Sequence, residues 1–135
     1  MKIKKLILVI TILLAPITPV RAENWKLLTT SLDGTEFYLD IDSITKEYFG
    51  NVYFWRVSNF QERSKSNALS SKIYSRSDCD TLAVQLLKTE FYDGHFGKGK
   101  LISSNGKIEE WFYPLKGALE NIQAITKEAC TLVNN

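Results

Sequence analysis

The side chains that could carry chemistry in this chain are one histidine, two cysteines and several closely spaced carboxylates. His95 lies in a glycine-rich corner, residues 94–99, where a solvent-exposed loop position is favoured over a catalytic base. One histidine and two cysteines do not make up the ligand set of a zinc site. We therefore expect neither a metal ion nor another cofactor.

Two pairs of aspartates have the alternate spacing that places both side chains on one face of a strand. They are Asp40 with Asp42, and Asp78 with Asp80. Either pair could offer oxygen atoms to Ca²⁺, but neither lies in a glycine-containing loop of the EF-hand type. Capping and turn hydrogen bonds are the favoured role.

Glu109 and Glu110 are adjacent in the sequence, so on a strand they would point to opposite faces. They do not form the paired carboxylates of a glycosidase. One enzyme hypothesis remains, a small exported hydrolase or carbohydrate-active enzyme that uses carboxylates such as Asp40 and Glu110.

The first 22 residues have the pattern of a secretory signal peptide. A lysine-rich start precedes the apolar run Leu6 to Leu14, and Val20-Arg21-Ala22 has compact side chains at the two positions that a signal peptidase reads. The apolar run is too short to span a bilayer, so no transmembrane segment is expected after cleavage. Without a cysteine near the cleavage point, no lipid anchor is expected. We predict cleavage after Ala22 and an exported domain over residues 23–135, either periplasmic or secreted to the cell surface.

Cleavage changes the charge balance of the chain. The leader contains 4 of the 17 basic residues and no acidic residue, which leaves 13 basic against 15 acidic side chains and a formal net charge of −2. Nucleic-acid binding requires clustered excess Lys and Arg, so this composition argues against it.

The two cysteines, Cys79 and Cys130, most simply form one disulfide in an oxidising compartment. The bond would attach the C-terminal segment to the body of the domain. Two buried free thiols are the alternative.

Alternating or apolar runs between turn signals predict a mainly β domain. Asp33-Gly34, Gly50-Asn51 and Asn105-Gly106 are the turn signals. The polar stretch Gln61 to Ser71 predicts an exposed hairpin loop, the segment that we expect to be most mobile. The pattern of residues 80–92 fits a helix or a strand, and its flanks favour a strand. The other predicted strands are 25–30, 36–41, 52–60, 72–78, one that begins at 101, and 108–113.

The period changes after Pro114. Apolar residues from Leu115 to Ala129 follow i, i+3, i+4, i+7 spacing, which predicts an amphipathic helix that ends near Cys130. Such a helix must bury its apolar stripe, and one face of the sheet can receive it.

An ordered set of motifs across 25–130 resembles the surface-adhesin protein E-like family of bacterial envelope proteins. The resemblance implies an α+β fold, with a single antiparallel sheet of about six strands and a C-terminal helix packed on one face and tied by the disulfide. It implies a strand over 80–92 and adhesion to host extracellular-matrix and serum proteins. This chain lacks the family's lipidation cysteine. The motifs are Tyr38-x-Asp40-x-x-Ser43-Ile44, Tyr53-Phe54-Trp55, Asp78-Cys79-Asp80, Phe91-Tyr92, Gly97-Lys98-Gly99, Trp111 and Cys130.

The chain contains more aromatic residues than one core layer needs, 7 Phe, 6 Tyr and 3 Trp. Some are therefore expected on the sheet face away from the helix, where aromatic anchors could bind another protein or a second copy. We predict Tyr38, Phe54 and Arg56 on this outward surface, with the 61–71 loop beside it. The favoured function is a non-enzymatic, adhesin-like binding module, and a periplasmic inhibitor-like or structural protein is a further alternative.

Overall fold

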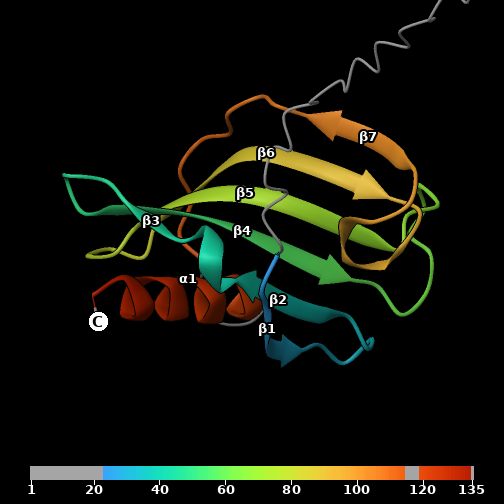
Figure 1. The fold of residues 1–135 in the computed structure, drawn as a ribbon, viewed down its shortest axis with the longest axis horizontal. Coiled ribbons are helices and arrows are strands. Elements are labelled where there is room, and N and C mark those ends of the chain that lie inside the picture. Colours follow the sequence, from blue (N-terminus) through green and yellow to red (C-terminus); the bar gives the residue numbers. More distant parts are fainter. Residues whose placement is uncertain (1–22, 115–118, 135) are drawn as a thin grey trace, which may run out of the picture.

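In the described part of the chain, seven strands form one antiparallel sheet, and one long helix covers part of one of its faces (Figure 1). The computed structural model describes residues 23–114 and 119–134, so the predicted signal peptide and the predicted helical start at Leu115 lie outside the described residues. The strand order is β1-β2-β4-β5-β6-β7, and β3 pairs with β4. The strands are β1 (Trp25–Thr30), β2 (Glu36–Asp40), β3 (Thr45–Lys46), β4 (Asn51–Asn59), β5 (Ser70–Asp78), β6 (Val84–Tyr92) and β7 (Leu101–Asn105).

The first hairpin follows its turn signal. Gly34 has φ +81°, a backbone conformation that glycine adopts without a steric penalty. Strand β2 then leads into the short helix η1 (Ile41–Ser43), whose first turn is capped by the Asp40 side chain. This turn returns the chain to β4 through β3.

The three longest strands, β4, β5 and β6, form the centre of the sheet. Their register places Tyr53 opposite Arg76 and Trp55 opposite Tyr74. Side chains directly opposite each other in an antiparallel pair point to the same face, so this register decides which side chains meet.

The core lies between the sheet and helix α1 (Glu120–Val133). Leu39, Val52 and Phe54 are buried from the strand side, and Ile125 and Ala129 from the helix side. The periodicity therefore predicted the packing stripe of the helix correctly. The described helix begins at Glu120, and the predicted residues before 119 lie outside the described part.

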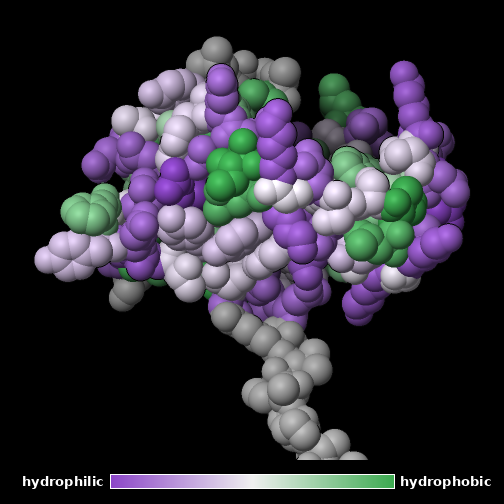
Figure 2. All heavy atoms as spheres, turned by 90° about the horizontal axis from the view of Figure 1, so that it is seen from above, coloured by the Kyte–Doolittle hydropathy of each residue, from purple (hydrophilic) through white to green (hydrophobic). Residues whose placement is uncertain are grey.

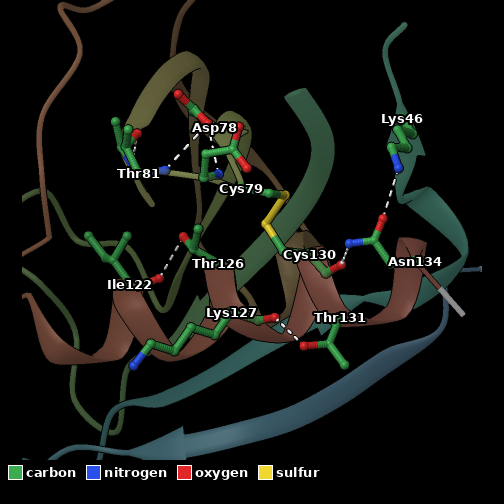
Figure 3. The surroundings of a disulfide bond; sticks show 12 residues. Lys46, Asp78, Cys79, Thr81, Ile122, Thr126, Lys127, Cys130, Thr131 and Asn134 are labelled. Atoms are coloured by element: carbon green, nitrogen blue, oxygen red, sulfur yellow. Dashed lines mark hydrogen bonds between the residues drawn. A yellow bond between two sulfur atoms is a disulfide. The ribbon is translucent and has the colours of Figure 1, made fainter. Parts of the chain in front are cut away.

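The disulfide is present between Cys79, just after β5, and Cys130 in the last turns of α1 (Figure 3). The Cα–Cα distance of 5.6 Å is typical of an unforced disulfide. Close by, Asp78 accepts a hydrogen bond from the Asp80 backbone N–H at 2.9 Å, which shapes the turn that carries Cys79. Lys46 of β3 donates to Asn134 at the helix end at 2.8 Å.

Residues 84–92 form strand β6, which confirms the strand interpretation of that ambiguous segment. Residues 79–83 are a turn in which Leu82 has φ +60°. The sheet and its single C-terminal helix agree with the predicted fold class.

The predicted hairpin from Leu101 to Tyr113 is wrong in its second half. Residues 108–113 do not pair with β7; Phe112 instead exchanges hydrogen bonds of 2.8 and 2.9 Å with Val84 of β6. The Asn105 side chain accepts from the Lys107 N–H, which turns the chain locally and lets it continue along the same edge of β6.

The predicted loop Gln61 to Ser71 is shorter than expected. Ser70 and Ser71 belong to β5, and Ala68 is fully buried. The Leu69 N–H donates to the Tyr92 carbonyl at 2.9 Å, so the end of this segment is tied to β6. Residues 61–63 and 65–67 are exposed, as the polar pattern indicates.

Candidate binding surface on the open face of the sheet

The sheet face opposite the helix carries a row of aromatic rings with two cations between them. Alternation along β4 separates Phe54, which packs under the helix, from Tyr53 and Trp55, which point the other way. We define the aromatic face by its residues, Trp25, Tyr53, Trp55, Lys72, Tyr74, Arg76 and Trp111.

Three of the rings pack in a continuous row across β4 and β5. Trp55 stacks on Tyr74 with ring centroids 5.0 Å apart and an interplanar angle of 27°. Tyr74 also lies 6.1 Å from Tyr53. Burial raises the pKa of the Tyr74 hydroxyl, and the nearby Tyr53 adds to this effect, so the ring stays neutral under ordinary conditions.

The two cations extend this row at both ends. The Lys72 ammonium lies 5.0 Å from the Trp55 ring centroid and 5.9 Å from that of Trp25. The Arg76 guanidinium lies 4.7 Å from the Trp111 centroid and 6.0 Å from that of Tyr53. Both arrangements are within the range of cation–π attraction. Lys72, Tyr74 and Arg76 are at alternate positions of β5, so their side chains point to the same face of the sheet.

Residues just before β4 form hydrogen bonds with two of the aromatic residues on that strand. The Ser43 hydroxyl in η1 accepts a hydrogen bond from the Trp55 backbone N–H at 2.8 Å and donates to the Asp40 backbone carbonyl at 2.7 Å. The Tyr53 hydroxyl donates to Glu47 at 3.2 Å. The first contact fixes the backbone of β4 at Trp55, and the second restrains the Tyr53 ring before any partner binds, which lowers the entropy cost of binding.

A hollow of about 350 Å³ opens at the Trp25 end of the row. Trp55 and Tyr74 supply apolar wall, and Glu23, Asp40 and Lys72 are among the polar lining residues. Lys72 is ion-paired with Glu23. Two backbone N–H groups, those of Asn24 and Asp42, donate to Asp40 at 3.0 and 3.3 Å, so both carboxylates have structural partners.

A second polar cluster lies next to the row on β6. Glu90 accepts hydrogen bonds from Tyr92 at 2.9 Å and from Lys88 at 2.5 Å. Burial alone would raise the pKa of Glu90, but the donors outweigh it and hold that pKa below its usual range. Burial and the Glu90 hydrogen bond raise the pKa of Tyr92 to about 12.

The surface residues predicted from the sequence are only partly on this face. Phe54 is 1 % exposed and Arg56 is 4 % exposed, so their assignment to the outward surface is wrong. Arg56 lies directly opposite Leu39, a core residue on the helix side, and therefore shares its face. Burial lowers the pKa of Arg56 to about 10, and it stays charged at neutral pH.

Tyr38 does point to the open face, where its ring packs 4.9 Å from Phe96 and its hydroxyl donates to Glu36 at 2.8 Å. Sequence reasoning missed Trp25, Trp55 and Tyr74 as surface residues. The alternation of β4 would have found Trp55 if the helix side of that strand had been known.

The other candidate residues have structural roles or exposed positions. His95 is exposed in the short helix η2 (His95–Gly97). Asp40 and Asp78 cap turns, as the sequence indicated. Among residues 23–114 and 119–134, no cluster of three potential metal ligands is present.

Asp40 and Glu110, the carboxylates of the enzyme hypothesis, line different hollows. Glu109 and Glu110 share a hollow of about 710 Å³ with Leu86 and Trp111. Both glutamates are exposed, whereas paired catalytic carboxylates typically lie in desolvated clefts.

A second exposed aromatic group lies at the tip of the hairpin that joins β3 to β4, which projects at the left of Figure 1. Tyr48 is 96 % exposed and Phe49 is 86 % exposed, and their rings meet edge to face at 5.5 Å. Elsewhere, the view from above in Figure 2 shows hydrophobic side chains in small groups separated by hydrophilic ones.

Across the described residues, none of the helices has the length and apolar character needed to cross a bilayer.

The family comparison and the structural comparison with known proteins agree. A family profile described as "Surface-adhesin protein E" matches residues 25–131. Crystal form II of Haemophilus influenzae protein E is similar in structure, with a TM-score of 0.65 and 21% identity over 90% of this chain and 98% of that one. Another H. influenzae protein E structure has a TM-score of 0.64 and 20% identity over 90% and 95% of the two chains. The comparison with curated proteins gives no match.

Proposed function

This chain belongs to the surface-adhesin protein E family, and we propose that it is an exported, non-enzymatic protein that binds a protein partner through its aromatic face. The observation that carries this proposal is the row of rings and cations on β4 and β5, on the sheet face opposite the helix. Aromatic and arginine side chains dominate the energetics of protein interfaces, and here they are arranged on a rigid element.

The partial exposure of the rings favours a binding role over a purely structural one. The rings of Trp25, Trp55 and Tyr74 are half-buried rather than enclosed, and Trp111 is 39 % exposed. A partner that covered them would remove further apolar area from water, while the interleaved charges keep the uncovered surface soluble.

Export is the second part of the proposal. We propose that residues 1–22 are a signal peptide, cleaved after Ala22, and that the mature domain acts in the periplasm or at the cell surface without a lipid anchor. The disulfide supports an oxidising compartment. The description of the family as surface adhesins supports an extracellular or envelope partner.

A solid-phase binding assay against a panel of extracellular-matrix and serum proteins tests the proposal, with sedimentation to detect self-association. The Trp55→Ser/Tyr74→Ser variant should lose partner capture, because it removes the stacked centre of the aromatic face. The matched control is Tyr48→Ser/Phe49→Ser, which removes two aromatic side chains from the hairpin tip instead.

Urea unfolding shows whether each variant is folded. If the hairpin-tip variant loses capture and the aromatic-face variant keeps it, the binding surface is elsewhere and the proposal is wrong.

A further inference from the structure

Arg76 is a cation on the aromatic face that has no carboxylate partner in the described part of the chain. The neighbouring cations are neutralised: Lys72 pairs with Glu23, and Lys88 with Glu90. The other described ion pair, Lys26 with Glu128, joins β1 to the helix. Of the two cations that define the aromatic face, only Arg76 therefore lacks a direct carboxylate ion pair among the described residues.

Neutral groups hold the guanidinium in one position. One terminal nitrogen donates to the Gln85 side-chain oxygen at 2.7 Å, and the other donates to the Tyr53 hydroxyl at 3.4 Å. Gln85 is itself fixed, because its amide nitrogen donates to the Glu109 carbonyl at 2.9 Å. The Trp111 ring covers one side of the guanidinium.

These contacts leave hydrogen-bonding capacity unused. Two of the five N–H bonds of an arginine have described partners here, and the Nε atom is buried without one. A half-buried guanidinium has lost part of its hydration, and aromatic faces and amide oxygens stabilise it without neutralising its charge. An anion that reached this position would supply the missing counter-charge.

We propose that Arg76 is the anchor for a carboxylate, presented by an aspartate or glutamate side chain of the protein partner. This inference rests on the proposed function, since it assigns the chemistry of the partner segment that covers the aromatic face. The planar fork of the guanidinium matches the two oxygens of a carboxylate, and the pair is charge-balanced one to one. A phosphate group would bring about two negative charges to this single guanidinium and leave an excess of negative charge.

Nuclear magnetic resonance titration of the purified, disulfide-bonded protein tests the inference. The probes are a short peptide of alternating glutamate and tyrosine, its glutamine counterpart, and a counterpart with phosphoserine in place of glutamate. The glutamate peptide should shift the Trp111 indole N–H and the Arg76 Nε–H signals in a saturable way, and the glutamine peptide should bind at least about tenfold more weakly.

Two variants of Arg76 separate charge from geometry. Arg76→Gln should reduce the affinity for the glutamate peptide about tenfold or more, and Arg76→Lys should recover part of it because the charge remains but the fork is lost. Lys88→Gln is the matched control, because it removes one positive charge from the adjacent strand on the same face. It should leave the affinity within about twofold.

Several results would overturn the inference: equal binding of the glutamate and glutamine peptides, equal losses in Arg76→Gln and Lys88→Gln, or tighter binding of the phosphoserine peptide. The solid-phase assay separates this inference from the proposed function. If Trp55→Ser/Tyr74→Ser loses capture and Arg76→Gln keeps full capture, the carboxylate anchor is rejected and the proposed function stands. Full capture in both variants would reject the proposed function itself.

Discussion

At the scale of single residues, the two sides of strand β4 have different roles. Tyr53 and Trp55 meet cations and rings on the open face, whereas Phe54 between them packs under the helix. Core and surface positions therefore alternate within three consecutive aromatic residues.

This alternation predicts unequal costs for two neighbouring truncations. Phe54→Ala should lower the free energy of unfolding by about 3–5 kcal/mol, because the ring is fully buried and its removal leaves a cavity. Tyr53→Ala is the matched control and should cost less than about 2 kcal/mol, because that side chain is half-exposed. Urea unfolding measures both values, and equal costs would contradict the assignment of the two faces.

At the scale of elements, the helix depends on tertiary contacts. Leu119 occupies the N-cap position, where its apolar side chain makes no capping hydrogen bond. The helix is held by its packing on β1, β2 and β4 and by the Cys79–Cys130 bond near its other end. An isolated helix of this length is marginal in water, so these restraints decide whether it is formed.

The disulfide closes a sequence separation of 51 residues. A Cys79→Ser/Cys130→Ser variant should therefore lose about 4 kcal/mol of unfolding free energy in the chain-entropy description. Hydrogen exchange should show that the amides of α1 lose protection before those of β4 and β5. Uniform loss of protection across helix and sheet would show that the bond does not act mainly on the helix.

At the scale of the whole molecule, the first two residues of the predicted mature chain make contacts with the rest of the domain. The Glu23 side chain pairs with Lys72 on the aromatic face, and the Asn24 carbonyl accepts from the Ile41 N–H at 3.1 Å. A leader that ended at Ala22 would leave the first residues of the domain free to make these contacts.

Mass spectrometry of the exported protein should therefore identify Glu23 as its first residue. Ala22→Tyr is the informative control, since a large residue next to the cleavage site should block processing and leave the intact leader. Recovery of a soluble chain that still begins at Met1 would contradict both the export and the cleavage site.

Local patterns predicted much of this fold. Clean alternation predicted the strand from Glu36, and the i, i+3, i+4, i+7 spacing predicted the helical stripe that includes Ile125 and Ala129. The presence of two cysteines in a chain with a predicted signal peptide predicted the Cys79–Cys130 disulfide. These features follow from the sequence because the period of a strand or helix is a property of its own residues.

The tertiary structure decided what local patterns leave open. Strand β4 has apolar residues on both faces, and only its pairing with Leu39 and the position of the helix show that Phe54 and Arg56 are buried. Likewise, the local pattern did not show that the segment around Phe112 pairs with β6 and not with β7. The aromatic face arises because the β4–β5 register places Tyr53 opposite Arg76, and such a register depends on residues distant in the sequence.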